Sequence, residues 1–369
     1  MKKAKALCIF TTLLGNKVTT ERLIEALNSI DAIDTTYVLV TTDDYRHYPV
    51  PRWARAMDAW ESRYLARRKL DALRNGTCDI LLVNCWEFVI EFRRLARRVP
   101  AAAYMDAVPT TVGDQLRRRG SGGWKRTLAT AVHDIPFRRA VRDFRYFLAA
   151  GSDCAGALEV RYQIPRDRCT VTLAPQDLKF WTPAPKSPSD LLRLLFVTND
   201  FARKGGVFLL QLYAGHLAGS CVLTIVSNDP TLENTVLPAG AVWRRGLSRD
   251  EILQAYRSSD LFLFPTLQDY MPQVLAEALS AGLPCIANDV GGIRDLIRDG
   301  ETGFLMPRDA PASVWADRII SLRSSPRDLD RLAKGARSFA ERNLDTGRFG
   351  ELIAGVIELL RTASRASRR

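Results

Sequence analysis

The chain has 369 residues, of which 47% are hydrophobic and 25% charged, the composition of a soluble globular protein. This length is enough for two domains that each bury a core. No apolar run approaches the roughly 20 residues of a membrane span. The seven cysteines include no pair at metal or redox spacing and the three histidines are scattered, so we expect no metal site and a reducing, cytoplasmic setting.

The net charge of +12 is concentrated in the first half, where residues 1–180 hold 30 Lys and Arg against 20 Asp and Glu. Such a field attracts phosphates, anionic lipids or nucleic acid. Trp124 and Phe137 lie among the basic residues, a mixture that suits an anionic bilayer surface. No nucleic-acid motif accompanies the charge, so no such partner is expected. The basic clusters are Arg93-Arg94, Arg97-Arg98, Arg117-Arg118-Arg119, Lys125-Arg126, Arg138-Arg139 and Arg142.

Short aliphatic runs alternate with longer amphipathic stretches, which predicts parallel, doubly wound sheets in an α/β protein. The alternation occurs twice, and the proline-rich segment Trp181–Ser189 separates the halves. We therefore predict one Rossmann-like domain at 1–180, a second at 181–345, and a C-terminal helix with a basic tail at 346–369, crossing back to the first domain. The expected strands are Ala6–Phe10, Thr36–Thr41, Ile80–Val83, Phe147–Ala150, Leu192–Val197, Val222–Val226, Leu261–Phe264 and Pro284–Ala287.

The most informative stretch follows the Leu261–Phe264 strand. A polar loop carries Asp269, and a helix is expected from Pro272 because the fixed φ of proline suits the first turn. The backbone amides around Met271–Val274 would then lie at a helix N-terminus and form an anion site suited to a diphosphate. Glu277, one turn further, is placed to bind a pair of ribose hydroxyls.

Asp269 and Glu277 are separated by seven residues, and the pattern continues through Gly291-Gly292 and Asp299-Gly300. This ordered string resembles the acid-x7-acid block of retaining GT-B glycosyltransferases, the group called glycosyltransferase family 4 or group 1. The resemblance implies two Rossmann-like domains facing a cleft, with the sugar donor held mainly by the second. It implies that Asp269 holds sugar hydroxyls. Further donor-binding positions are expected at Tyr270, Met271, Pro272, Gln273 and Val274.

A second match is Phe196–Gly206, which resembles the strand, loop and helix that grip the donor diphosphate in this family. Arg203 can fork onto phosphate oxygens, and Lys204 acts as a compact point charge. The chain departs from many relatives in having Thr198-Asn199 where they have Gly-Arg. Asn199 is therefore included among the expected donor contacts.

Three other regions resemble the family more weakly. Gly15-Asn16 follows the first strand, like the family's glycine loop beside the donor phosphates. Asp106 ends a strand-like run and is expected to bond the transferred sugar or the acceptor, with a loop cap as the alternative. Trp243 lies where relatives contact the base, and a core or rim aromatic is equally consistent. Asp177 is interpreted as structural, capping the linker.

The resemblance implies retaining transfer from a nucleotide-diphosphate sugar to an acceptor hydroxyl, with no metal or other cofactor. Lys204, Arg203 and the helix amides would stabilise the leaving diphosphate, and Asp269 and Asp106 complete the expected catalytic set. No pair of carboxylates suggests a double displacement, so front-face attack is expected. The expected acceptor is a glycan or lipid-linked glycan in polysaccharide or glycolipid synthesis, at the inner face of a membrane.

Two other functions remain open at this stage. One is a sugar-nucleotide epimerase or isomerase on the same fold, for which the chain offers few histidines as acid–base groups. The other is a non-catalytic binding protein, which the departures at Thr198-Asn199 and Asp269 would allow.

Overall fold

The computed structural model describes residues 3–12, 17–41, 43–44, 60–72, 78–110, 124–187 and 189–366, with backbone only at 60–62, 72 and 124–131. The chain forms two compact units. Unit 1 comprises Met1–Thr172 and Gly347–Arg369, and unit 2 comprises Leu173–Thr346. The boundary at Thr172 precedes the Trp181–Ser189 segment, which lies inside unit 2. Trp181 is buried there, and its ring packs edge-on against Tyr256.

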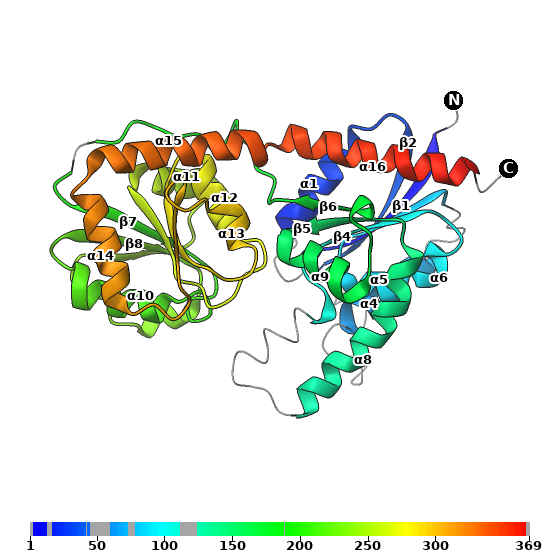
Figure 1. Cartoon of the computed structure of the whole chain (residues 1–369), viewed down its shortest axis with the longest axis horizontal. Coiled ribbons are helices and arrows are strands. Elements are labelled where there is room, and N and C mark those ends of the chain that lie inside the picture. Colours follow the sequence, from blue (N-terminus) through cyan, green and yellow to red (C-terminus); the bar gives the residue numbers. More distant parts are fainter. Residues whose placement is uncertain are drawn as a thin grey trace. The chain divides into compact units, whose positions relative to one another are not determined.

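The described part of unit 1 contains a six-stranded parallel sheet in the order β2-β1-β3-β4-β5-β6 (Figure 1). Its strands are β1 (Ala4–Thr11), β2 (Ile33–Val40), β3 (Ile80–Val83), β4 (Ala101–Met105), β5 (Tyr146–Ala150) and β6 (Cys169–Thr172). Its α-helices are α1 (Lys17–Asn28), α4 (Trp60–Ala72), α5 (Trp86–Glu91), α6 (Arg93–Ala96), α8 (Trp124–Ala140), α9 (Ser152–Tyr162) and α16 (Thr346–Ala366), and its 3₁₀ turns are η1 (Val141–Asp143) and η2 (Arg166–Arg168).

The described part of unit 2 contains a second six-stranded parallel sheet, in the order β12-β11-β10-β7-β8-β9. Its strands are β7 (Leu192–Val197), β8 (Cys221–Val226), β9 (Ala241–Arg244), β10 (Leu261–Phe264), β11 (Cys285–Asn288) and β12 (Gly303–Met306). Its helical segments are α10 (Gly206–Leu212), η3 (Tyr213–Leu217), η4 (Pro230–Asn234), α11 (Arg249–Ser258), α12 (Gln273–Ser280), α13 (Ile293–Leu296), α14 (Ala312–Arg323) and α15 (Pro326–Asn343).

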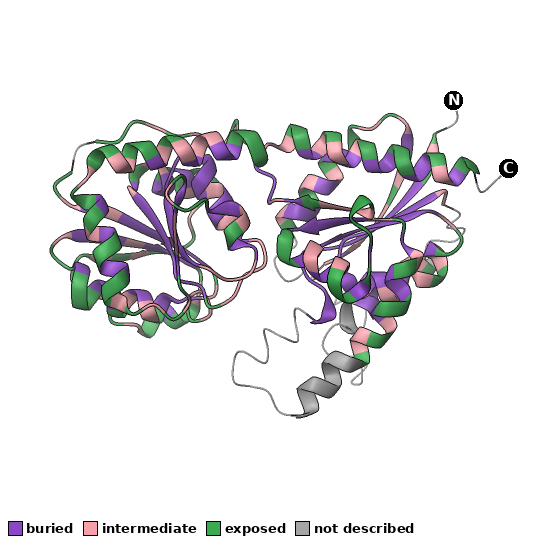
Figure 2. Cartoon of the chain, in the orientation of Figure 1, coloured by how far each residue is buried: buried purple, intermediate pink, exposed green. Residues whose placement is uncertain are grey.

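The central strands of both sheets are buried on both faces, as Figure 2 shows from the purple strands inside each unit, whereas the edge strands β2 and β9 are partly exposed. Parallel strands covered by helices are apolar along their whole length, and every residue of Leu261–Phe264 and of Cys285–Asn288 is buried.

Phe137 is also fully buried. Its ring lies edge-on to the Tyr162 ring, with the ring centroids 4.8 Å apart. Its expected place in a surface basic patch is therefore wrong: it is a core residue of unit 1. None of the described helices has the length and apolar character to span a bilayer.

Each sheet has one point where the strand order reverses. In unit 2 the chain runs from β7 to β8 on one side and returns to β10 on the other side of β7. From the carboxyl edge the chain therefore continues in opposite directions after β7 and after β10. Ligands of open parallel sheets bind at such points. In unit 1 the reversal lies between β1 and β3, where Asn84 accepts from the Thr11 amide (2.8 Å) and donates to the Thr20 hydroxyl (2.8 Å).

Glycines bring three loops at the carboxyl edge of unit 2 into direct backbone contact. A Cβ on Gly205, whose φ is +84°, would lie 2.0 Å from the carbonyl oxygen of Pro265. A Cβ on Gly291, whose φ is +56°, would lie 1.9 Å from the carbonyl oxygen of Asp269. The Gly292 amide donates to the Tyr270 carbonyl at 3.0 Å. The loops after β7, β10 and β11 are thus fixed against one another.

We expect Gly205→Ala to destabilise unit 2 more than Gly300→Ala does. Both glycines have positive φ, but a Cβ on Gly300 would meet nothing within 4 Å. Gly300→Ala should therefore lower the free energy of unfolding by about 1 kcal/mol, and Gly205→Ala by roughly twice that or more. Denaturant titration of the full chain measures both, and equal losses would contradict the close contact.

Candidate nucleotide-sugar site

Lys204 and Asp269 meet at the reversal point of the unit 2 sheet. Lys204 lies in the loop after β7 and Asp269 in the loop after β10, and the ammonium forms an ion pair with the carboxylate. The two side chains are only 15% and 14% exposed, and the ammonium also lies 5.4 Å from the centre of the Phe264 ring. Burial lowers the pKa of Lys204, and the neighbouring Asp269 opposes that change. The sequence places these residues 65 positions apart, and the fold brings them together.

The Arg203 side chain binds residues of its own loop, after β7, and of the loop after β10. Its guanidinium forms an ion pair with Asp200 and donates to the carbonyl of Gln268 at 3.2 Å. The Leu267 amide in turn donates to the Arg203 carbonyl at 3.1 Å. In this structure Arg203 therefore joins the loops after β7 and β10. The Arg203 side chain is 35% exposed, so part of the guanidinium, which has five N–H donors, is accessible from the surface.

The loop from Asp269 leads into α12 through Pro272, which occupies the N-cap position with extended backbone. The first amides of any α-helix have no carbonyl within the helix to receive them, so this end carries partial positive charge. Met271, Gln273 and Val274 are half-buried around it. The Gln273 side-chain oxygen accepts from Gln176 at 2.9 Å, which holds the N-terminus of α12 to the segment that enters unit 2. Tyr270 lies in the same loop, its carbonyl bound by Gly292.

Glu277 lies on α12 one turn beyond the amides. Its carboxyl accepts a hydrogen bond of 3.0 Å from the buried Tyr256 hydroxyl. Burial raises the pKa of Glu277 to about 7, and the Tyr256 bond and the charge of Arg249 oppose this only in part. Near neutral pH this carboxyl can therefore exist in either protonation state, and a ligand that donates hydrogen bonds to it would favour the ionised one.

Asn199 and Trp243 lie beside a different loop, the one after β8. The Asn199 side-chain oxygen accepts from the Asn228 amide at 3.1 Å, and the Trp243 indole donates to the Ser227 carbonyl at 2.9 Å. Trp243 is half-buried on the edge strand β9. The structure thus brings both residues to one loop, separate from the Lys204–Asp269 ion pair.

In unit 1, Asp106 follows β4 and is half-buried. It acts electrostatically on Glu87, whose pKa is raised to about 7 chiefly by burial and further by Asp106.

The sequence analysis did not identify Glu87 and Asn84. The available signal was their position, since Asn84 directly follows the Ile80–Val83 strand and Glu87 lies at the start of the next helix, α5. Gly15 and Asn16 lie outside the described residues. The described residues contain no group of three or more His, Cys, Asp or Glu suited to a metal.

Two units that each contain a six-stranded parallel sheet give the chain a GT-B fold, and a cation, two acids and a helix N-terminus lie at the strand-order reversal of unit 2. The fold resembles that of sucrose-phosphate synthase from Thermosynechococcus elongatus, with a TM-score of 0.79 over 98% of this chain and 100% of that one, at 15% identity. It also resembles Anabaena HepE in complex with UDP and glucose, with a TM-score of 0.68 over 96% and 99% of the two chains, at 12% identity.

The sequence matches cover only part of the chain. Over 100 residues the chain is 35% identical to the D-inositol 3-phosphate glycosyltransferase of Streptomyces bingchenggensis, covering 27% of this chain and 22% of that protein. Over 115 residues it is 36% identical to sulfoquinovosyl transferase SQD2 of Arabidopsis thaliana, covering 30% and 22%. The matches thus span less than a quarter of either relative. Residues 192–325 match the model of the glycosyl transferases group 1 family.

The raised pKa of Glu277 predicts a pH-dependent stability. Its folded pKa of about 7 lies above the ordinary value of 4.5, so its contribution to stability is fully present below about 4.5 and is lost as pH rises toward 7. Glu277→Gln should therefore gain stability relative to the native protein between pH 4.5 and 7.

The matched control is Glu251→Gln on α11. Hydrogen bonds from the Ser248 amide and hydroxyl lower the pKa of Glu251, so its contribution is present at neutral pH and lost as pH falls. Denaturant titrations at several pH values should show opposite trends for the two variants. A parallel trend would contradict the buried state of Glu277.

Proposed function

We propose that the chain is a retaining, metal-independent glycosyltransferase that moves a sugar from a nucleotide-diphosphate sugar to an acceptor hydroxyl. The observation that carries the proposal is the Lys204–Asp269 ion pair at the reversal point of the unit 2 sheet, beside the N-terminus of α12. The match of residues 192–325 to the glycosyl transferases group 1 model supports the reaction class. The UDP and glucose bound to Anabaena HepE support a nucleotide-sugar donor.

The proposed chemistry assigns one task to each group. The diphosphate leaves as charge builds on its oxygens, and Lys204 and the amides of α12 stabilise that charge in a partly buried, low-dielectric site. Asp269 accepts hydrogen bonds from sugar hydroxyls. Glu277 accepts them from the ribose and becomes ionised as it does so.

Retention is explained most simply by attack on the face that the diphosphate leaves. The acceptor hydroxyl then passes its proton to a leaving phosphate oxygen, so one C–O bond breaks as another forms on the same face. Asp106 in unit 1 would bond the acceptor or the transferred sugar. Arg203, already bonded to Asp200 and Gln268, would move onto the phosphate or else hold the loop in place.

We further propose a glycan or lipid-linked glycan as the acceptor, in polysaccharide, glycolipid or other glycoconjugate synthesis at the cytoplasmic face of a membrane. The name of one relative, D-inositol 3-phosphate glycosyltransferase, supports a hydroxyl-bearing acceptor that carries an anionic group. The basic excess of residues 1–180 would favour an anionic membrane surface.

The proposal predicts that Lys204→Ala weakens UDP binding about ten-fold or more, because a charge-assisted contact is lost and Asp269 is left to repel the diphosphate. The double variant Lys204→Ala/Asp269→Asn should recover part of the affinity, since the uncompensated carboxylate is gone. Calorimetric titration with UDP, GDP and ADP measures this and identifies the base.

Lys334→Ala is the matched control, because Lys334 is an exposed lysine paired with Asp330 on α15. It should bind as the native protein does. Native affinity in Lys204→Ala would refute the site. Isomerised donor after incubation with UDP-glucose alone would favour an epimerase, and absence of binding to every nucleotide would favour a non-catalytic protein.

A further inference from the structure

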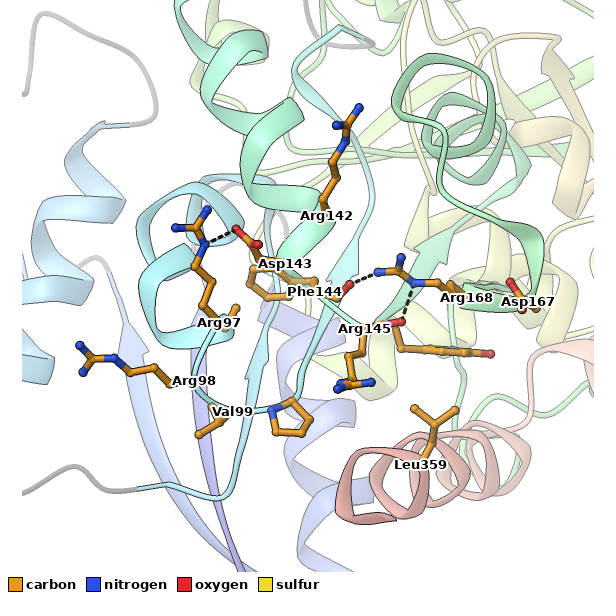
Figure 3. A pocket seen from close by; sticks show the side chains of 13 residues that line it. Arg97, Arg98, Val99, Arg142, Asp143, Phe144, Arg145, Asp167, Arg168 and Leu359 are labelled. Carbon is orange, nitrogen blue, oxygen red and sulfur yellow. Dashed lines mark hydrogen bonds and ion pairs between the residues drawn. The ribbon is translucent and has the colours of Figure 1, made fainter. Parts of the chain in front are cut away.

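Unit 1 contains a hollow of about 670 Å³ that none of the roles above uses (Figure 3). Its walls are the segments that lead into β4, β5 and β6, together with Leu359 of α16. Because these segments precede their strands, the hollow lies at the amino end of the parallel sheet. Asp106 follows β4 and lies at the opposite, carboxyl end. The hollow is therefore distinct from the proposed acceptor side of unit 1.

Arginines dominate the lining of this hollow. Five arginines and two aspartates line it. One of the aspartates, Asp143, already forms ion pairs with two arginines. The Asp143 carboxylate binds Arg93 at 2.6 Å and Arg97 at 3.1 Å. Within the described part of the chain, Arg98, Arg142 and Arg145 have no carboxylate within ion-pair distance. The five lining arginines are Arg97, Arg98, Arg142, Arg145 and Arg168.

Arg168 is held in place by the backbone. Its guanidinium donates to the carbonyl of Arg145 at 3.0 Å and also to the carbonyl of Phe144. Burial lowers the pKa of Arg168, and the like charge of Arg145 lowers it further, whereas the exposed Asp167 raises it by more than Arg145 lowers it. Like charges that line one hollow repel each other, and an anion bound between them would relieve that repulsion. Figure 3 shows Arg168 on one side of the hollow and Arg97 with Asp143 on the other.

A second hollow, of about 780 Å³, adjoins the first and shares Arg97 and Arg98 with it. It repeats the same charge pattern. The Glu91 carboxylate is shared by Arg63 at 3.1 Å and Arg67 at 2.7 Å, and Arg93 and Arg94 complete the basic wall. The excess of arginine is therefore continuous across both hollows, with Arg97 and Arg98 on the ridge between them.

We propose that these two hollows form a binding site for a phosphate-bearing anion, independent of the nucleotide-sugar site in unit 2. The planar fork of arginine matches the oxygens of phosphate, and several forks around one hollow favour a ligand with more than one charge. A soluble polyphosphate and the phosphorylated headgroup of a lipid share this chemistry.

The test is a calorimetric titration of the full chain with tripolyphosphate, alongside co-sedimentation with vesicles of phosphatidylcholine containing phosphatidic acid. Arg98→Gln/Arg145→Gln removes two lining guanidinium groups that form no hydrogen bond or ion pair with the described residues. The control Arg68→Gln/Arg139→Gln removes the same charge from exposed positions of unit 1 outside both hollows. Both variants should bind UDP at native strength, which separates this site from the proposed donor site.

We expect the lining variant to lose about ten-fold or more in affinity, and the control less than two-fold. Loss with tripolyphosphate alone would assign the site to soluble anions, loss with vesicles alone to lipid headgroups, and loss with both to either source. Each supports the site. Equal binding by both variants and the native protein in both assays would overturn it.

Discussion

Glycine lets three loops of unit 2 approach more closely than any side chain would allow. The carbonyl oxygens of Pro265 and Asp269 lie about 2 Å from where a Cβ would stand on Gly205 and Gly291. Each contact joins a loop after one strand to the loop after its neighbour. Since Lys204 directly precedes Gly205, and Asp269 itself receives the contact from Gly291, the positions of both charged groups follow from this backbone packing.

The charges at this edge are arranged to balance one another in the unliganded protein. Lys204 is neutralised by Asp269, and Arg203 by Asp200. A buried ammonium without an acid beside it would tend to lose its proton, because burial already lowers the pKa of Lys204. Asp269 opposes that loss. In the proposed mechanism a bound diphosphate would take over this role, and Asp269 would then accept hydrogen bonds from sugar hydroxyls.

Much of this arrangement could be predicted from the sequence, and the failures have physical causes. All eight predicted strands exist, and the central ones could be recognised because buried parallel strands are continuous apolar runs. The strand β4 was only partly anticipated, since Ala101-Ala102-Ala103 has weak strand preference and is fixed by its neighbours β3 and β5. Asp177 does cap its segment, accepting from the amides of Lys179 and Phe180.

Side-chain partners were beyond sequence reasoning. Lys204 and Asp269 were assigned to different parts of the donor, and nothing in their spacing indicates that they bind each other. Phe137 was expected at a surface because basic residues surround it, whereas only the fold reveals that its ring faces the core. Glu87 and Asn84 carried no motif, and their importance depends on which strands become neighbours at the reversal point of unit 1.

The division of the chain also bears on the order in which the protein is completed during synthesis. Unit 2 is one continuous segment, and its two ends are tied together where the Gln176 amide donates to the Leu344 carbonyl at 2.6 Å. Unit 1 is translated first but draws α16 from the last part of the chain, burying Ile353, Val356, Ile357 and Leu360. The earlier half therefore waits for its closing helix until the last part of the chain has been made. A premature stop codon after residue 346 would accordingly damage the part of the protein that is made first.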